Sequence, residues 1–280
     1  MKDCLMDGLI DTLKLLPYLL ITFIVLEIIE HKLSKKNEEV LTKNKKYGPI
    51  LGGLLGGFPQ CGFSVVGSNL FSSRVITMGT LIAIYLSTSD EMLPIMLSEH
   101  TDILVLLKII GFKVLIGISI GIIIDLILRK KEEKVVDNIT DMCHDEHCHC
   151  EEEGVIISSI KHTLKIGLFI LIANLVINLI IYKVGEDNLS NLLLNKNILT
   201  YFLASLIGLI PNCAASVIIT ELYLEGLITI GCLFSGLLTG CGLGLLVLFK
   251  QNKNIKENIT ILSIIYCVGV IVGLLIDLVA

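Results

Sequence analysis

Charged residues are scarce in this chain. Asp, Glu, Lys and Arg make up 18% of its 280 residues, whereas hydrophobic residues make up 54%. A soluble protein needs many more polar side chains to cover its surface. Instead, apolar runs of roughly 20 residues, enough to cross about 30 Å of hydrocarbon, occur repeatedly. The composition therefore predicts an all-α polytopic membrane protein.

Several functional motifs are absent from the sequence. It contains no basic domain that would bind nucleic acid, and no Gly-x-x-x-x-Gly-Lys-Ser/Thr run that would bind a nucleotide. The apolar segments do not combine His, Ser and acidic residues, which argues against an intramembrane enzyme. The first ten residues carry Asp3 and Asp7 and make a poor signal peptide. We therefore expect neither enzymatic activity nor a nucleic-acid partner.

The nine cysteines do not form the pattern of a disulfide framework, which is typical of small secreted domains. Three of them crowd into one hydrophilic loop, and five lie inside apolar segments. These five are Cys61, Cys213, Cys232, Cys241 and Cys267. We interpret the cysteines as packing residues or free thiols.

The chain contains an internal repeat. DTLKLLPYLLITFIVLEII at 11–29 matches HTLKIGLFILIANLVINLI at 162–180, and GIIIDLIL at 121–128 matches GLLIDLVA at 273–280. Between these matches, Pro59, Cys61, Ser64, Val65, Thr77, Gly79 and Leu81 align with Pro211, Cys213, Ser216, Val217, Thr229, Gly231 and Leu233. The sequence thus predicts a first transmembrane repeat at 1–128 and a second at 155–280, joined by a polar linker at 129–154.

Each repeat is expected to contain an apolar helix, a segment broken at a proline (48–72 and 199–222) and two further apolar segments (75–97 and 103–128; 226–249 and 259–280). Proline removes a backbone donor and clashes with the preceding helical turn. The broken segment is therefore predicted to enter the membrane and return as a re-entrant pair of half-helices. This gives three crossings per repeat and about ten segments in all.

An odd number of crossings inverts the second repeat relative to the first. The loop charges agree, because 31–47 carries six lysines and 250–258 carries three, whereas 90–102 has neither Lys nor Arg. Since basic loops stay in the cytoplasm, we expect 31–47, 250–258 and the linker to be cytoplasmic. Inverted repeats with broken helices at the midplane are typical of secondary transporters.

The residues at the two breaks predict a substrate site. Half-helix ends leave backbone groups unpaired, Gln60 and Asn212 add amides, and the two cysteines add thiols suited to a soft ion. Glu221 could couple transport to protons. The predicted substrate-binding set is Pro59, Gln60, Cys61, Ser64, Asn69, Pro211, Asn212, Cys213, Ser216 and Glu221. The alternative is that Cys and Ser are simply small residues that allow close helix packing.

The linker sequence CHDEHCHCEEE at 143–153 predicts a second site. Imidazole and thiolate ligands in a reducing cytosol favour zinc, copper or similar ions. The candidate ligands are Cys143, His144, His147, Cys148, His149 and Cys150. The spacing is too compressed for a zinc finger with its own core, so we expect a flexible chelating segment, or alternatively a solvated acidic tether. No cofactor other than this ion is expected.

The segments GGFPQCGFSVVGSNL and GLIPNCAASVIITEL, with the His/Cys/acid-rich loop between them, resemble the ten-transmembrane heavy-metal exporter family, a bacterial group also described as arsenic-efflux or manganese transporters. The resemblance covers most of the chain. It implies an exporter of metal or metalloid ions in a bacterial-type plasma membrane. Thiols favour arsenic or another soft species, whereas manganese prefers carboxylates, amides and hydroxyls.

The sequence is also compatible with an alternative function. A passive ion channel, or a membrane metal sensor in which the linker is the working part, is the alternative function. The sequence is compatible with more than one transported ion and coupling ion, and with a homo-oligomer.

Overall fold

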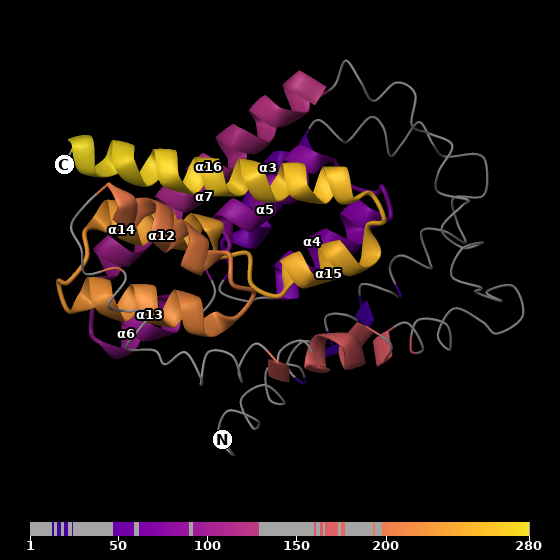
Figure 1. The fold of residues 1–280 in the computed structure, drawn as a ribbon, viewed down its shortest axis with the longest axis horizontal. Helices are drawn as coiled ribbons and strands as arrows, with labels where there is room; N and C mark the ends of the chain where they lie inside the picture. Colours follow the sequence, from indigo (N-terminus) through magenta and orange to yellow (C-terminus); the bar gives the residue numbers. More distant parts are fainter. Residues whose placement is uncertain are drawn as a thin grey trace, which may run out of the picture.

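The computed structural model describes residues 47–58, 62–89, 92–128 and 198–279, with scattered residues between 13 and 24 and between 160 and 193. Every regular element in these ranges is α-helical, as predicted (Figure 1). The helices of the first half are α3 (Gly48–Gly56), α4 (Gly62–Ser72), α5 (Met78–Ser87), α6 (Met92–Ser98) and α7 (Ile103–Leu128). Those of the second half are α12 (Leu199–Gly208), α13 (Cys213–Leu224), α14 (Ile230–Thr239), α15 (Gly244–Gln251) and α16 (Ile255–Val279). The apolar helices predicted at about 11–30 and 160–182 lie largely outside the described residues.

Three stretches of the described chain are long and apolar enough to cross a membrane. They are α7, α16 and Ile230–Gln251, which contains α14 and α15. Only 22% of the apolar span of α7 and 28% of that of α16 is buried inside the protein. Such outward-facing apolar surface suits lipid rather than water. Within the described ranges, the prediction of an all-helical membrane protein is thereby confirmed.

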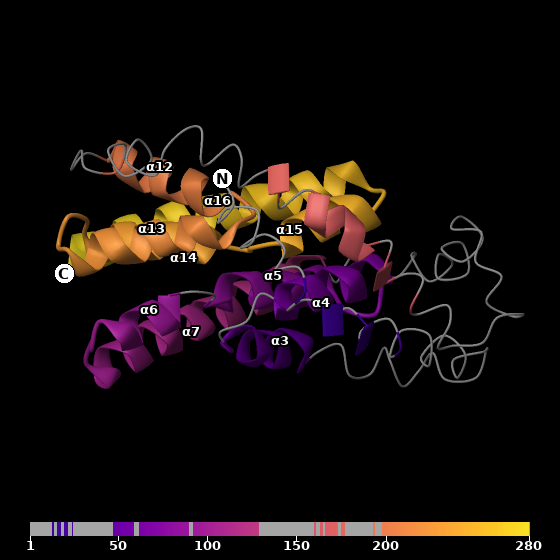
Figure 2. The same cartoon turned by 90° about the horizontal axis from the view of Figure 1, so that it is seen from below.

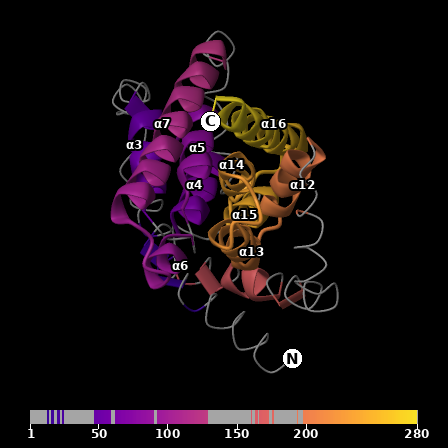
Figure 3. The same cartoon turned by 90° about the vertical axis from the view of Figure 1, so that its left-hand side faces the viewer.

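The two halves of the chain pack in matching ways. In the first half α5 packs against α3 and α7, and in the second half α14 packs against α12 and α16. Figures 2 and 3 show the halves side by side, with α5 and α14 toward the centre. Across the boundary α4 packs against α15, and α13 packs against α6. Each short helix that follows a predicted proline break therefore contacts the other half.

Two repeat-equivalent aspartates anchor the starts of α5 and α14. In the first half, the Asp125 carboxylate accepts hydrogen bonds from the Thr77 hydroxyl (2.6 Å) and the Gly79 amide (2.8 Å). In the second half, the Asp277 carboxylate accepts from the Thr229 hydroxyl, the Gly231 amide (2.9 Å) and the Tyr201 hydroxyl (2.7 Å). The unpaired amides at a helix start favour such an acceptor.

Glycines at matching positions let these helices approach closely. A Cβ at Gly79 would lie 2.2 Å from the Gly121 carbonyl oxygen, and a Cβ at Gly231 would lie 2.3 Å from the Gly273 carbonyl oxygen. Both distances are far below van der Waals contact, so neither glycine tolerates a side chain without a shift of the backbone. The Thr-x-Gly match seen in the sequence thus corresponds to the same helix–helix contact in each half.

We expect replacement of either aspartate by alanine to destabilise the protein. Each loss removes charge-assisted hydrogen bonds at a helix start, a cost of about 1.5–3 kcal/mol in the free energy of unfolding. The thermal unfolding temperature of the purified protein in detergent measures the effect. Lys108→Ala is the control, because Lys108 is exposed on α7. An Asp277→Ala protein as stable as wild type would show that the capping contact contributes nothing.

The apolar segments predicted at 75–97 and 226–249 are not continuous helices, which corrects the sequence interpretation. α5 ends at Ser87 and α6 begins at Met92, while α14 ends at Thr239 and α15 begins at Gly244. The Thr88 hydroxyl donates to the Ile84 carbonyl (2.8 Å) at the first interruption. Local side-chain bonds of this kind compete with the helix. At the second interruption the cause is glycine, since Gly242 has a positive φ of 52°.

Candidate functional site

The second proline break is an interruption between two short helices. α12 ends at Gly208 and α13 begins at Cys213. Asn212 has an extended backbone (φ −151°, ψ 146°), and its side-chain oxygen accepts a hydrogen bond from the Ala214 amide at 2.7 Å. It is therefore the N-cap of α13. This Asn212 oxygen is engaged by the protein, which the sequence interpretation did not anticipate.

The first proline break is described only at its edges. α3 ends at Gly56 and α4 begins at Gly62. The predicted site residues Pro59, Gln60 and Cys61 lie outside the described residues.

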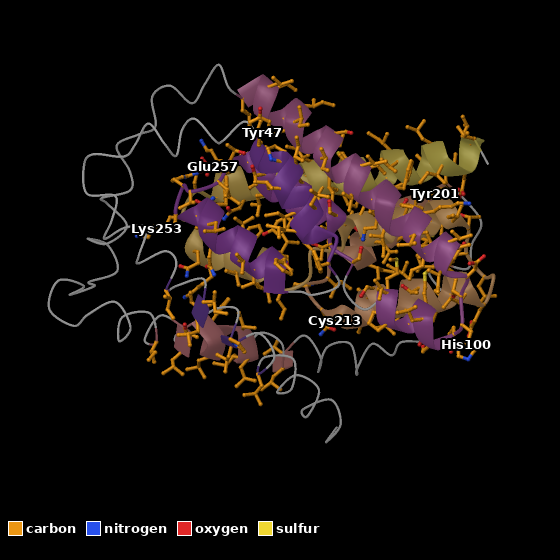
Figure 4. The ribbon with its side chains drawn as sticks, turned by 180° about the vertical axis from the view of Figure 1, so that it is seen from behind. Tyr47, His100, Tyr201, Cys213, Lys253 and Glu257 are labelled. Carbon is orange, nitrogen blue, oxygen red and sulfur yellow. The ribbon has the colours of Figure 1, made fainter. Side chains whose placement is uncertain are left out.

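Cys213 lies between the two ends of the molecule. In Figure 4, Tyr47, Lys253 and Glu257 lie toward one end, Tyr201 and His100 lie toward the other, and Cys213 is between them. α12 has 10 residues and α13 has 12. At 1.5 Å per residue they are about 15 and 18 Å long, too short to cross about 30 Å of hydrocarbon.

The two predicted serines occupy different surroundings. Ser216 is buried on α13, and its hydroxyl donates to the Cys213 carbonyl at 2.8 Å. Ser64 is fully buried on α4 and faces α15, where a Cβ at Gly244 would lie 2.8 Å from the Ser64 Cβ and from its carbonyl oxygen. The Ser216 hydroxyl is therefore engaged within its own helix, whereas Ser64 lies at the boundary between the halves.

A buried hydroxyl pair joins α4 to the other half. The Ser68 hydroxyl lies 2.7 Å from the carbonyl oxygens of Ser64 and Gly244, and 2.6 Å from the Tyr85 hydroxyl. Ser68 has one proton for two acceptors, and Tyr85 can donate to it in turn. Neither Ser68 nor Tyr85 was among the predicted site residues. The signal for this cluster is the i, i+4 spacing of Ser64 and Ser68 on an apolar helix, which places two hydroxyls on one face.

Asn69 and Glu221 are repeat-equivalent but are placed differently. Glu221 lies on the exposed face of α13. Asn69 on α4 is 2% exposed, and neither its amide nitrogen nor its amide oxygen has a hydrogen-bond partner in the described part of the chain. A buried polar group left unsatisfied costs about 1–3 kcal/mol. Such a group is consistent with a residue kept for a ligand.

Replacing Asn69 by leucine separates a binding role from a structural one. Leucine removes both unsatisfied atoms at similar volume, so we expect an unchanged or higher unfolding temperature. If the amide binds the ion, transport should fall by about tenfold, the equivalent of ~1.4 kcal/mol. Thermal unfolding and vesicle transport on the same preparation test this. A stable Asn69→Leu protein with full transport would exclude Asn69 from the site.

Lys113 on α7 is a fully buried lysine that was not among the predicted site residues. Its ammonium donates to the backbone carbonyls of Thr88, just after α5, and of Leu237 in the last turn of α14 (3.0 Å). The signal was available in the sequence, since only Lys108, Lys113 and Asp125 are charged in the 26 residues of α7. A charged residue inside a membrane span marks a functional site by default.

The predicted metal ligands of the linker, from Cys143 to Cys150, lie outside the described residues. Within the described ranges, no group of three His, Cys, Asp or Glu side chains is placed to hold a metal ion. The chelating linker therefore stays a prediction from the sequence.

Comparison with known proteins gives one finding. The model of a family described as "Putative, 10TM heavy-metal exporter" matches residues 2–200. The matched range includes the first half of the chain and the linker. No curated protein and no solved structure matches the chain.

Proposed function

This chain belongs to the 10TM heavy-metal exporter family, and on that premise we propose that it is a secondary transporter with two inverted repeats. The substrate is a metal or metalloid ion, which binds at the two Pro-x-Cys breaks. The observation that carries the proposal is the interruption between two short helices. α12 ends at Gly208 and α13 begins at Cys213, and Cys213 lies between the two ends of the molecule (Figure 4).

The placement of the helix ends supports inversion. Tyr47, which precedes α3, lies toward the end of the molecule that holds Glu257, whereas Tyr201, near the start of the equivalent helix α12, lies toward the opposite end (Figure 4). Figure 1 shows α13 returning toward the end from which α12 starts. Starts toward opposite ends of the molecule are what inverted re-entrant segments would require, and they support the proposal.

The contacts between the halves support alternating access. Arg74, just after α4, forms an ion pair with Glu257 at the start of α16 (2.9 Å). Arg74 has a positive φ of 59°, a strained conformation for arginine, whereas its repeat equivalent is Gly226 with a φ of 71°. An arginine at this strained position is explained if its ion pair with Glu257 is needed to hold the two halves together.

The chemistry of the breaks supports a soft substrate. The Cys213 thiol lies at the start of α13, and Cys61 is its repeat equivalent. Thiol ligands favour arsenic species and other soft ions over manganese. The N-terminus of a helix also carries a partial positive charge that stabilises an oxyanion or the negative charge of a complex.

Growth of expressing cells tests the export function. We expect cells with the protein to tolerate higher concentrations of arsenite or an organoarsenical than cells with an empty vector, and to accumulate less of the element. Manganese, zinc and copper complete the panel. Equal growth and equal cell content for every ion, with the protein present in the membrane, would contradict export.

The linker is proposed to collect or sense the ion rather than to form the pathway. We expect a 137–154 peptide to bind a soft or borderline divalent ion under reducing conditions, because it carries three Cys and three His. Deletion should lower the transport rate without abolishing it. Calorimetry measures the peptide, with a peptide in which Ser replaces each Cys and Asn each His as control. Absence of binding would end the chelator role, and complete loss of transport in a folded deletion would make the linker part of the pathway.

A further inference from the structure

Lys113 lies where two interrupted helices end. Thr88 follows the last residue of α5, and Leu237 is in the last turn of α14. The Leu237 carbonyl lacks the usual helical partner because the Cys241 amide donates instead to Thr239 at 2.8 Å. The Lys113 ammonium therefore donates to one backbone carbonyl at the end of α5 and to one at the end of α14.

The two helix ends contribute negative partial charge beside the ammonium. Each helix C-terminus carries a partial charge of about −0.5, which favours a cation at that end. A lysine at the centre of a membrane span costs about 2.5–3.5 kcal/mol by insertion scales. Lys113 is the eleventh residue of α7, about 15 Å from its start and therefore near mid-membrane. The carbonyls at the two helix ends, Thr88 and Leu237, offset part of this cost by accepting hydrogen bonds from the ammonium.

The second repeat has no equivalent cation. The position 152 residues after Lys113 is Ile265, which is fully buried on α16. One lysine thus serves both helix ends, and its two bonds link α7 of the first half to α14 of the second. An apolar residue at 113 would have avoided the cost of a buried charge, which indicates that the ammonium itself is required.

We propose that the Lys113 ammonium is a tethered cation occupying a cation site between the ends of α5 and α14, so that transport requires no external Na⁺. In transporters built from broken helices, half-helix C-terminal ends and unwound carbonyls hold the coupling Na⁺ or proton. Lys113 supplies that positive charge from within the chain. The role in transport rests on the proposed function, whereas the cation site itself does not.

Substitutions at Lys113 test the site in the purified full-length protein. Lys113→Ala opens space beside the two carbonyls, so Na⁺, Li⁺ or methylammonium should raise its lowered unfolding temperature saturably by several degrees, as expected for a ligand at many times its Kd. Lys113→Met fills the space without charge and should be destabilised but unresponsive. Lys113→Arg should retain most of the stability. Wild type and Lys108→Ala, the exposed lysine on the same helix, should not respond to any of these cations.

Vesicle transport completes the test. Wild-type transport should be equal in NaCl and choline chloride, whereas Lys113→Ala should be reduced about tenfold or more and partly restored by Na⁺ or methylammonium. Saturable Na⁺ dependence of the wild type, or full stability and transport of Lys113→Met, would overturn the proposal. A folded Lys113→Ala protein whose unfolding temperature does not change with any of these cations would also overturn it. If Lys113→Ala does not fold, the stability and transport of Lys113→Arg and Lys113→Met test the proposal instead. The thermal measurement uses no metal substrate, so loss of the export hypothesis would leave its result standing.

Discussion

Gly244→Val is expected to abolish or strongly reduce transport. A Cβ at Gly244 would lie 2.8 Å from two atoms of Ser64, and the Gly244 carbonyl is also within 2.7 Å of the Ser68 hydroxyl. A valine there pushes α15 away from α4 at the boundary between the halves. Overpacking of this kind costs about 1–3 kcal/mol. We expect a lower unfolding temperature and a transport rate reduced by about tenfold or more.

Gly240→Ala is the matched control in the same interruption. A Cβ at Gly240 would meet its nearest atom at 3.5 Å, an ordinary contact, and its φ of −69° suits alanine. Transport and unfolding temperature should therefore match wild type. If Gly244→Val is as active as Gly240→Ala, the tight contact between α4 and α15 has no part in transport.

The double variant Cys61→Ser/Cys213→Ser is expected to lose soft-ion export while remaining folded. Serine nearly conserves the volume of cysteine and replaces a soft sulfur ligand with a hard oxygen. Arsenite transport should fall by about tenfold or more. Vesicle uptake measures it, and the double variant Cys232→Ser/Cys241→Ser, at buried positions in α14 and its interruption, is the control for general loss of cysteine. Full arsenite transport by Cys61→Ser/Cys213→Ser would make both thiols packing residues.

The parts of the fold that follow from uninterrupted hydrophobicity were predictable. The segment predicted at 103–128 coincides with α7, since apolar residues continue through that range. The interruption between α14 and α15 was not predictable in the same way. Gly240, Gly242 and Gly244 read as apolar in a hydropathy pattern, and only the backbone shows that Gly242 adopts a positive φ.

The candidate site was predictable where the repeat aligned and not where partners lie far apart. The interruption before Cys213 follows from proline chemistry and from the match between repeats. The partners of Lys113 do not follow, because Leu237 is 124 residues away and contributes only a backbone carbonyl. The burial of Asn69 could not be predicted either. In the sequence, a buried asparagine looks the same as one at a solvated helix end.

The most direct test of the central claim is ion accumulation by energised inside-out vesicles that contain either wild type or Pro59→Ala/Pro211→Ala. Alanine lets each broken segment close into a continuous helix and removes the backbone groups that would hold the ion. Wild-type vesicles should accumulate at least one of these ions: arsenite, an organoarsenical, manganese, zinc or copper. The folded double-proline variant should accumulate none of them. Equal accumulation by the two proteins would contradict a transport site at the Pro-x-Cys breaks.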